Sequence, residues 1–239
     1  MGKNINFRVH LPGWLTKLFP QAIWLLPSGE KTLYLSFDDG PVPEVTSWVL
    51  DILHEKNIKA TFFCVGDNVR KYPELFERMK REGHSVGNHT HNHLQGIKCM
   101  KTTYLNNIEE ANNYIASDLF RPPHGIMTQS QYKAIIQKYK LVMWDVISCD
   151  YDPSLSPEKC IKNVIDFVRD GSIITFHDSV KAKKNIMQAL PTVIDTLTKQ
   201  GYQFKKIEFT DGAPLIKLST LKEDQSIQTN INKLLRGAS

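Results

Sequence analysis

The chain has 239 residues, of which 41% are hydrophobic, so it can bury a sizeable core and is not disordered as a whole. Its 30 basic and 25 acidic residues give a formal net charge of +5. The basic residues are scattered rather than interleaved with aromatic residues, which argues against a nucleic-acid-binding protein. Four widely spaced cysteines without a Cys-x-x-Cys pair indicate reduced thiols.

The start of the chain bears on where the protein works. Residues 1–9 are polar and lack the apolar region of a secretory signal peptide, so we predict a cytoplasmic protein. Residues 11–27 are apolar, but Lys17 and three prolines interrupt them well short of the ~20 residues that cross a bilayer. We expect this segment to close the bottom of the domain, because the prolines oppose a continuous amphipathic helix. Peripheral contact with a membrane surface is the alternative.

An alternation of strands and helices begins at residue 32. The predicted strands cover residues 32–37, 59–65, 84–88, 118–121, 141–146, 172–176 and 202–207. The predicted helices begin at Pro43, at Pro73, near residue 102, at the capping box that opens with Thr128, at Ser156 and before Ile186. Pro191 either kinks the last helix or marks its start.

This alternation predicts an α/β fold with a parallel sheet. Seven strand–helix units without a glycine-rich nucleotide-binding motif favour a TIM-barrel-like fold with one strand fewer than usual. An open doubly wound sheet is the alternative. We predict one domain over residues 32–210, preceded by a segment, 1–31, that packs on it. The tail at 211–239 has no predicted place in the fold.

Polar residues gather where the predicted strands end. They are Asp38, Asp39, His89, His91, His93, Arg121, Asp145, Asp150, His177 and Asp178. Parallel barrels place their active sites at the carboxyl ends of the strands. Side chains alternate along a strand, so one carboxylate of the Asp38–Asp39 pair can bind a cation while the other acts as a base. Taken alone, the pair also fits an ordinary turn that leads into a helix.

The spacing of the histidines points to a metal site. His89 and His93 are four residues apart, so their imidazoles can point the same way across one turn. With one carboxylate they form a His₂Asp set that leaves a position open for water, as in catalytic zinc sites. We expect Asn88 and Thr90 to orient the two rings. A histidine-rich surface loop that binds nothing is the alternative.

Five segments resemble the five motifs of the polysaccharide deacetylase family, also known as carbohydrate esterase family 4 or the NodB homology domain. In the family's order they are residues 36–40 (SFDDG), 89–93 (HTHNH), 121–125 (RPPHG), 144–151 (WDVISCDY) and 173–178 (IITFHD). The resemblance implies a distorted (β/α)₇ barrel. It also implies a hydrolase that removes acetyl groups from N-acetylated amino sugars in an oligo- or polysaccharide.

The resemblance implies a metal site. Asp39, His89 and His93 would bind one divalent cation, with zinc expected and cobalt, nickel or manganese as alternatives. The backbone N–H beside His124 would face the oxyanion that forms on the acetyl carbonyl.

The resemblance also implies an acid and a base. Asp38 would take a proton from water, and Arg121 would contact and orient it. His177 would protonate the leaving amine, and Asp150 would hold its imidazolium form.

Three residues depart from the family's pattern. His124 stands in place of a Tyr, which matters little if only the backbone amide is used. Tyr151 replaces a Trp on the wall of the substrate groove, and Thr175 replaces a Leu that contacts the acetyl methyl group. The substrate and the fit of the acyl group are therefore open, while the chemistry is not affected.

Three other polar residues near the motifs have weaker assignments. His91 is expected to face solvent or the groove rather than to bind the metal. Asp145 is expected to pack beside the metal site, and Asp178 to cap the helix that follows it.

Two alternatives to an N-deacetylase remain. The same residues could hydrolyse O-acetyl esters such as acetylated xylan, or the chain could be a non-catalytic carbohydrate-binding relative. No catalytic or metal-binding residue of the family is missing, which disfavours the second. A metal-dependent nuclease or phosphatase is disfavoured because no basic cradle for phosphate is evident. A cytoplasmic enzyme would act on a short oligosaccharide or a lipid-linked precursor rather than on finished wall polymer.

Overall fold

The computed structural model describes residue 9 and residues 16–209 of the chain. Its strands form one parallel sheet in the order β5-β4-β3-β2-β1-β7-β6, and β8 pairs with β1 beside this path. The strands are β1 (Thr32–Asp38), β2 (Thr61–Cys64), β3 (Ser85–Asn88), β4 (Leu119–Phe120), β5 (Lys140–Leu141), β6 (Val146–Ile147), β7 (Ile173–His177) and β8 (Gln203–Lys205).

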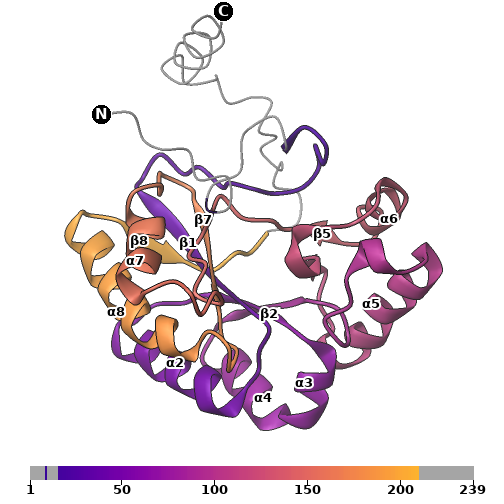
Figure 1. Ribbon diagram of the computed structural model, residues 1–239, viewed down its shortest axis with the longest axis horizontal. Coiled ribbons are helices and arrows are strands. Elements are labelled where there is room, and N and C mark those ends of the chain that lie inside the picture. Colours follow the sequence, from indigo (N-terminus) through magenta and orange to yellow (C-terminus); the bar gives the residue numbers. More distant parts are fainter. Residues whose placement is uncertain (1–8, 10–15, 210–239) are drawn as a thin grey trace, which may run out of the picture.

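Helices surround the curved sheet. They are α2 (Pro43–Glu55), α3 (Gly66–Lys71), α4 (Pro73–Arg81), α5 (Lys101–Ile115), α6 (Gln129–Ile135), α7 (Pro157–Ile165) and α8 (Lys183–Lys199), with short 3₁₀ turns η1 (Gly96–Lys98) and η2 (Pro123–Gly125). In Figure 1, α7 and α8 lie at the left, α2, α3 and α4 below, and α5 and α6 at the right. The predicted barrel-like α/β fold is confirmed.

Strand β1 lies at the centre of the sheet and positions the site. It pairs with β7 along one edge, and along the other it pairs with β8 at residues 32–34 and with β2 at residues 36–38. Leu33, Leu35 and Phe37 have no solvent exposure and belong to the main hydrophobic core. Side chains alternate along a strand, so Ser36 and Asp38 point the other way, into the interior of the barrel.

The helices follow their apolar periodicity. Helix α2 begins at Pro43 and buries Val45, Val49 and Leu53 against the core that contains β1. The predicted capping box is confirmed at α6: the Thr128 side chain accepts a hydrogen bond from the backbone N–H of Gln131, and the Gln131 side chain accepts one from Thr128.

Three elements differ from the prediction. The expected strand at 141–146 is two strands, β5 and β6, because the backbone N–H of Met143 bonds to Ile23 and that of Asp145 bonds to Ile173. Helix α3 was not predicted, since Val69 is its only large apolar residue. Helix α8 begins at Lys183 and contains Pro191, so the proline does not mark its start.

Residues 23–25 lie between the two ends of the strand path. Ile23 forms a parallel bridge with Val142, next to β5, and Leu25 forms an antiparallel bridge with Ser172, which precedes β7. Residues 22–25 are all buried. Trp14 and Leu15 of the predicted closing segment, and the whole of the 211–239 tail, lie outside the described residues.

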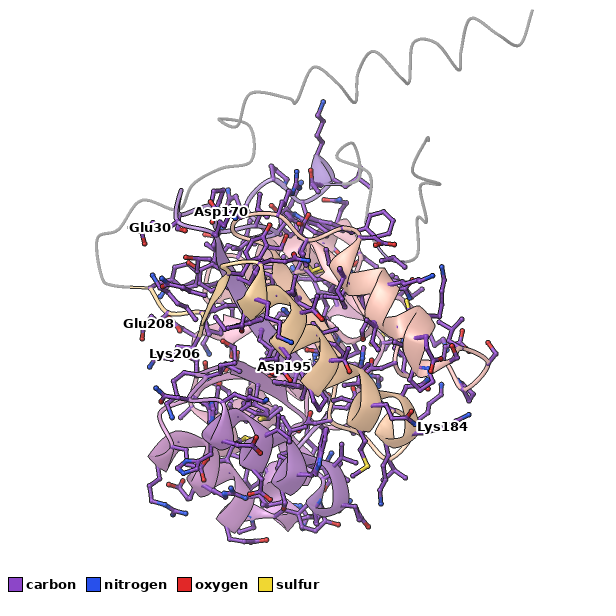
Figure 2. The ribbon with its side chains drawn as sticks, turned by 90° about the vertical axis from the view of Figure 1, so that its left-hand side faces the viewer. Glu30, Asp170, Lys184, Asp195, Lys206 and Glu208 are labelled. Carbon is purple, nitrogen blue, oxygen red and sulfur yellow. The ribbon has the colours of Figure 1, made fainter. Side chains whose placement is uncertain are left out.

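Asp170 holds the turn at residues 28–32, which leads into β1, against the sheet. Its carboxylate accepts hydrogen bonds from the backbone N–H groups of Ser28, Gly29 and Thr32 at 2.7–2.9 Å, and Figure 2 labels it near Glu30. These bonds fix the point at which the chain enters β1. Within residues 16–209, no helix has both the length and the apolar character that a membrane crossing would need.

The closure by residues 23–25 predicts a large loss of stability when it is weakened. Ile23 is 7% exposed and packs with Phe63, Leu119 and Val142, so Ile23→Ala should lower the free energy of unfolding by about 2–5 kcal/mol. Ile97→Ala is the matched control, because Ile97 is 54% exposed and its loss should change stability by less than about 0.5 kcal/mol. Urea denaturation measures both, and equal effects would contradict the closing role.

Candidate active site and metal centre

Arg121 lies beneath the candidate site and has no solvent exposure. Its Nη1 donates to Oδ1 of Asp38 at 2.6 Å, to Oγ of Ser36 at 3.0 Å and to Oγ1 of Thr175 at 3.1 Å. The guanidinium carbon lies 4.0 Å from the centre of the Phe63 ring. The contact with Asp38 agrees with the prediction, whereas the hydrogen bonds to Ser36 and Thr175 were not predicted.

The other two nitrogens of the Arg121 guanidinium donate to backbone carbonyl oxygens. Nε of Arg121 donates to the carbonyl oxygen of Val142 at 3.3 Å, and Nη2 donates to that of Met143 at 2.9 Å. Arg121 therefore connects β1 and β7 to the chain that follows β5, and its charge is balanced by Asp38.

Asp39, His89 and His93 form a cluster that could hold a metal ion. One ligand atom from each lies within 4.8 Å of the others. Oδ1 of Asp39 is 3.2 Å from Nε2 of His93 and 3.8 Å from Nε2 of His89. The left-handed backbone of Asp39, with φ 86°, turns it out of the strand that Asp38 ends.

His89 has the state that a metal ligand needs. Its Nδ1 is 2.8 Å from the carbonyl oxygen of Arg121, so an Nδ1–H donor there leaves Nε2 free to face Asp39. Burial lowers the pKa of His89 to about 4, which outweighs the nearby Asp38 carboxylate. The imidazole is therefore neutral near pH 7.

The histidine turn is held through its backbone. The side chain of Asn88 accepts a hydrogen bond from the N–H of Thr90 at 2.8 Å, and Oγ1 of Thr90 accepts one from Leu94 at 3.0 Å. Both side chains bond to the main chain rather than to an imidazole, so any orienting of the rings by Asn88 and Thr90 acts through the backbone. Thr90 and His93 both have positive φ, which lets the two imidazoles approach with ring centres 5.2 Å apart.

The surroundings of Asp39 keep its carboxylate negatively charged, which favours the binding of a cation. Burial opposes its ionisation, but contact with His93 and the nearby His177 and His89 outweigh burial and hold the pKa of Asp39 well below its usual range. Within the described part of the chain, Oδ1 of Asp39 is buried and accepts no hydrogen bond. A buried carboxylate oxygen that faces two imidazole nitrogens has the donor set of a divalent metal site.

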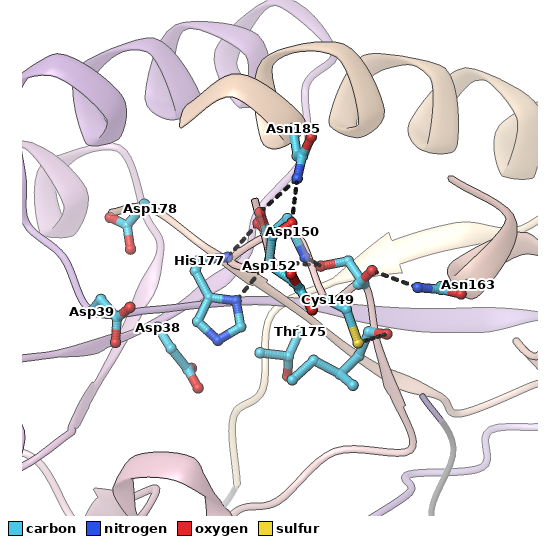
Figure 3. Close-up of polar contacts among 12 residues, drawn as sticks. Asp38, Asp39, Cys149, Asp150, Asp152, Asn163, Thr175, His177, Asp178 and Asn185 are labelled. Carbon is cyan, nitrogen blue, oxygen red and sulfur yellow. Dashed lines mark hydrogen bonds and ion pairs between the residues drawn. The ribbon is translucent and has the colours of Figure 1, made fainter. Parts of the chain in front are cut away.

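His177 forms a second charged pair across the site from the metal cluster. Its Nδ1 is 2.8 Å from Oδ1 of Asp150, and its backbone N–H donates to Oδ2 at 2.9 Å. Burial lowers the pKa of His177, but the Asp150 carboxylate outweighs burial and raises it to about 9. Ser148 donates to Asp150 at 2.8 Å. Figure 3 shows the His177 ring between Asp150 and the Asp38–Asp39 pair.

The three positions that depart from the family's pattern lie in different surroundings. The ring of His124 is exposed and contacts that of His93 edge to face at 4.9 Å, and the Tyr151 ring contacts His177 in the same way at 4.8 Å. Thr175 is fully buried beneath His177, where it bonds to Arg121. Contact of any of the three with a substrate stays a prediction.

Two expectations about neighbouring aspartates are wrong. Asp145 does not lie beside the metal cluster: it precedes β6 and bonds to Ser172 at 2.6 Å and to Arg169 at 2.9 Å, at the opposite end of the sheet. Asp178 does not cap α8, whose N-cap is Ala182.

Asp178 holds the loop after β1, a role that the sequence reasoning missed. Its Oδ1 accepts a hydrogen bond from the backbone N–H of Gly40 at 3.0 Å, and its Oδ2 accepts one from Thr46 at 2.6 Å. Burial, with a contribution from Asp39, raises the pKa of Asp178 to about 7 against the effect of these donors.

His91 points away from the cluster. Its Nε2 is 3.4 Å from Oε1 of Glu110, and its ring stacks on that of Tyr114 with centres 5.8 Å apart. As expected, His91 is not a third imidazole of the metal cluster, but it packs against α5 rather than facing solvent.

A cavity of about 320 Å³ opens beside the metal cluster. It is lined by Asp39, Val42, Val65, Asp67, Asn68, Asn92, His93 and Ser179. Six of the eight lining residues have polar side chains, and two of these, Asp39 and His93, belong to the metal cluster. A sugar hydroxyl or amide would find hydrogen-bonding groups there.

Comparison with known proteins identifies the family. A model of the family described as polysaccharide deacetylase matches residues 26–144. A peptidoglycan-N-acetylglucosamine deacetylase of Bacillus cereus is 32% identical over 191 residues, which cover 76% of this chain and 88% of that protein. The chain belongs to the polysaccharide deacetylase family.

Two further relatives agree with this assignment. A chitooligosaccharide deacetylase of Bradyrhizobium is 31% identical over 196 residues, covering 74% of this chain and 89% of that protein. A crystal structure of a peptidoglycan N-acetylglucosamine deacetylase superimposes with a TM-score of 0.75 at 31% identity, covering 82% of this chain and 94% of that one. These relatives support a carbohydrate deacetylase.

The pairing of His177 with Asp150 predicts a proton-binding change. In the metal-free protein, Asp150→Asn should lower the pKa of His177 from about 9 toward its ordinary 6.5, because the carboxylate that raises it most is removed while burial remains. Titration of the imidazole resonances by NMR measures this. Asp195→Asn on the outer side of α8 is the control, and an unchanged His177 pKa in Asp150→Asn would contradict the assignment.

The same shift affects stability. The pKa of His177 is raised on folding, so its protonation stabilises the folded state fully below about pH 6.5, and this contribution is lost as pH rises through about 9. Between about pH 6.5 and 9, the free energy of unfolding of the metal-free wild type should therefore fall by more than that of metal-free Asp150→Asn.

Proposed function

We propose that this protein is a metal-dependent hydrolase that removes acetyl groups from N-acetylated amino sugars in an oligo- or polysaccharide. One observation carries the proposal: the Asp39–His89–His93 cluster shares the carboxyl ends of the strands with two charged pairs, Asp38 with Arg121 and His177 with Asp150. A cation site with a carboxylate on one side and a protonated imidazole on the other fits the hydrolysis of an amide.

Asp39, His89 and His93 would hold the cation. A divalent ion bound there would polarise the acetyl carbonyl and make a water molecule easier to deprotonate. Two imidazole nitrogens and one carboxylate favour zinc, with cobalt, nickel and manganese as alternatives.

Asp38 is positioned to act as the general base. Arg121 fixes one of its oxygens by the 2.6 Å bond to Oδ1, and Oδ2 lies 3.9 Å from Nε2 of His89, on the side of the metal cluster. The ion pair holds the carboxylate in one orientation, so Oδ2 is placed to accept a proton from water at the cluster.

His177 is positioned to act as the general acid. An amide nitrogen is a poor leaving group until it is protonated, so hydrolysis needs a group that carries a proton at neutral pH. The raised pKa of about 9 supplies that proton, and Asp150 holds Nδ1 so that Nε2 faces the site. Tyr151 packs on the same ring and restricts its orientation.

The N-acetylated substrate is supported by the relatives. The similar proteins are named as deacetylases of peptidoglycan N-acetylglucosamine and of chitooligosaccharide. Acetate release from a chitooligosaccharide, compared with release from acetylated xylan, tests this choice with and without a chelator. Greater release from xylan would replace the amide substrate by an ester, and no release from either would favour a non-catalytic relative.

The metal assignment predicts that His89→Ala loses the bound cation while the protein stays folded. Elemental analysis of the purified protein measures the metal, and circular dichroism checks the fold. His91→Ala is the matched control, because His91 lies in the same turn but faces Glu110 and should leave metal content unchanged. Stoichiometric metal in His89→Ala would refute the ligand set.

The base assignment predicts that Asp38→Asn keeps the metal but loses turnover by roughly 10²–10⁴-fold, because an amide cannot accept a proton from water. Acetate release at saturating substrate measures the loss, with metal content determined on the same sample. A wild-type rate would place the base elsewhere.

A further inference from the structure

Four large apolar side chains are exposed on three segments of the chain around α6. Among the described residues, only six large apolar side chains are strongly exposed, and these four are Leu18 (49%), Ile97 (54%), Met100 (74%) and Ile126 (45%). We call these four residues, with the exposed Lys98, Lys101 and Lys133, the rim patch. An exposed apolar group of this kind commonly marks an interaction site.

Hydrogen bonds join the three segments. The side chain of Gln131 donates to the carbonyl oxygen of Gly96 at 2.8 Å, and that of Gln129 donates to Leu18 at 3.1 Å. A Cβ placed on Gly96 would lie 3.3 Å from the carbonyl oxygen of Ile126, so η1 and the chain after η2 are in contact. Figure 1 shows α5 and α6 side by side, which agrees with this arrangement.

The charge of this region is positive. Residues 16–29, 85–108 and 119–144 contain no aspartate or glutamate. In the described part of the chain, Lys98, Lys101 and Lys133 form no ion pair with a carboxylate. The nearest acidic residues along α5, Glu109 and Glu110, are already engaged by Lys138 and His91.

The rim patch borders the active site. Ile126 directly follows η2, which contains His124, and the His124 ring contacts the ring of His93. Lys98 is also near enough to His124 for the two side chains to interact electrostatically. Whatever the rim patch binds is therefore held next to the metal cluster.

We propose that the rim patch docks on an anionic phospholipid surface and holds the mouth of the active site against it. Exposed aliphatic side chains insert at the boundary between headgroups and acyl chains, and lysines beside them are attracted to anionic headgroups. A neutral glycan chain would not need unpaired lysines, whereas an anionic lipid surface complements both parts of the patch. The proposal does not depend on the deacetylase chemistry.

Vesicle sedimentation with the full-length protein tests this. Binding should be strong to vesicles of phosphatidylcholine with phosphatidylglycerol and weak to phosphatidylcholine alone. The triple variant Ile97→Ser, Met100→Ser, Ile126→Ser should lose roughly tenfold or more in vesicle affinity, because three inserted side chains are removed. Lys98→Glu with Lys101→Glu should cause a similar loss and remove most of the dependence on salt.

Matched controls test whether the effect is specific to the rim patch, rather than a consequence of changing any exposed apolar side chain or any pair of lysines. Val180→Ser removes an apolar side chain that is 63% exposed outside the patch, and Lys183→Glu with Lys184→Glu reverses two charges on α8. Both should bind as wild type. His89→Ala should also bind as wild type, so failure of the proposed function would leave the docking result intact.

Three results would overturn the proposal. The first is that the wild-type protein binds neither kind of vesicle. The second is that the patch variants and the control variants lose vesicle affinity equally. The third is that only Lys98→Glu with Lys101→Glu loses affinity, while the triple serine variant binds as wild type. Sedimentation with insoluble peptidoglycan in place of vesicles gives the competing outcome: binding to the polymer alone, lost in the patch variants, would assign the patch to an anionic wall polymer.

Discussion

The buried ion pair of Arg121 and Asp38 determines the geometry of the site. A buried guanidinium is costly unless its charge is balanced and its N–H groups are bonded, and here the partners come from β1, from β7 and from the chain after β5. Removing one partner would leave a buried charge. The strand ends that carry the metal cluster and His177 are therefore held together by the group that orients the base.

His89 and His177 are both buried, yet their pKa values shift in opposite directions. At His89 burial lowers the pKa to about 4, which keeps the ring neutral, as metal binding requires. At His177 the Asp150 carboxylate outweighs burial and raises the pKa to about 9, which keeps the ring protonated, as an acid requires. The partner thus decides the role: a backbone carbonyl faces Nδ1 of His89, whereas a carboxylate faces Nδ1 of His177.

The sequence predicts the barrel and the meeting of Asp38, His89 and His177, because strand ends of a parallel sheet share one edge. It places Asp145 wrongly because residues 141–146 read as one strand, whereas hydrogen bonds to residues 23 and 173 divide them. Such bonds join segments far apart in the chain, and local periodicity contains no signal for them. The partners of Asp178 were missed for the same reason, since they lie more than 130 residues away.

Asp178 also explains why glycine follows the two aspartates. A Cβ at Gly40 would lie 2.0 Å from Oδ2 of Asp178, so the constraint on Gly40 is close approach rather than backbone conformation. That approach allows Asp178 to accept the Gly40 N–H, while its own N–H donates to the carbonyl oxygen of Asp38. The chain on both sides of Asp39 is thus bonded to the residue after His177, which couples the position of a metal ligand to that of the acid.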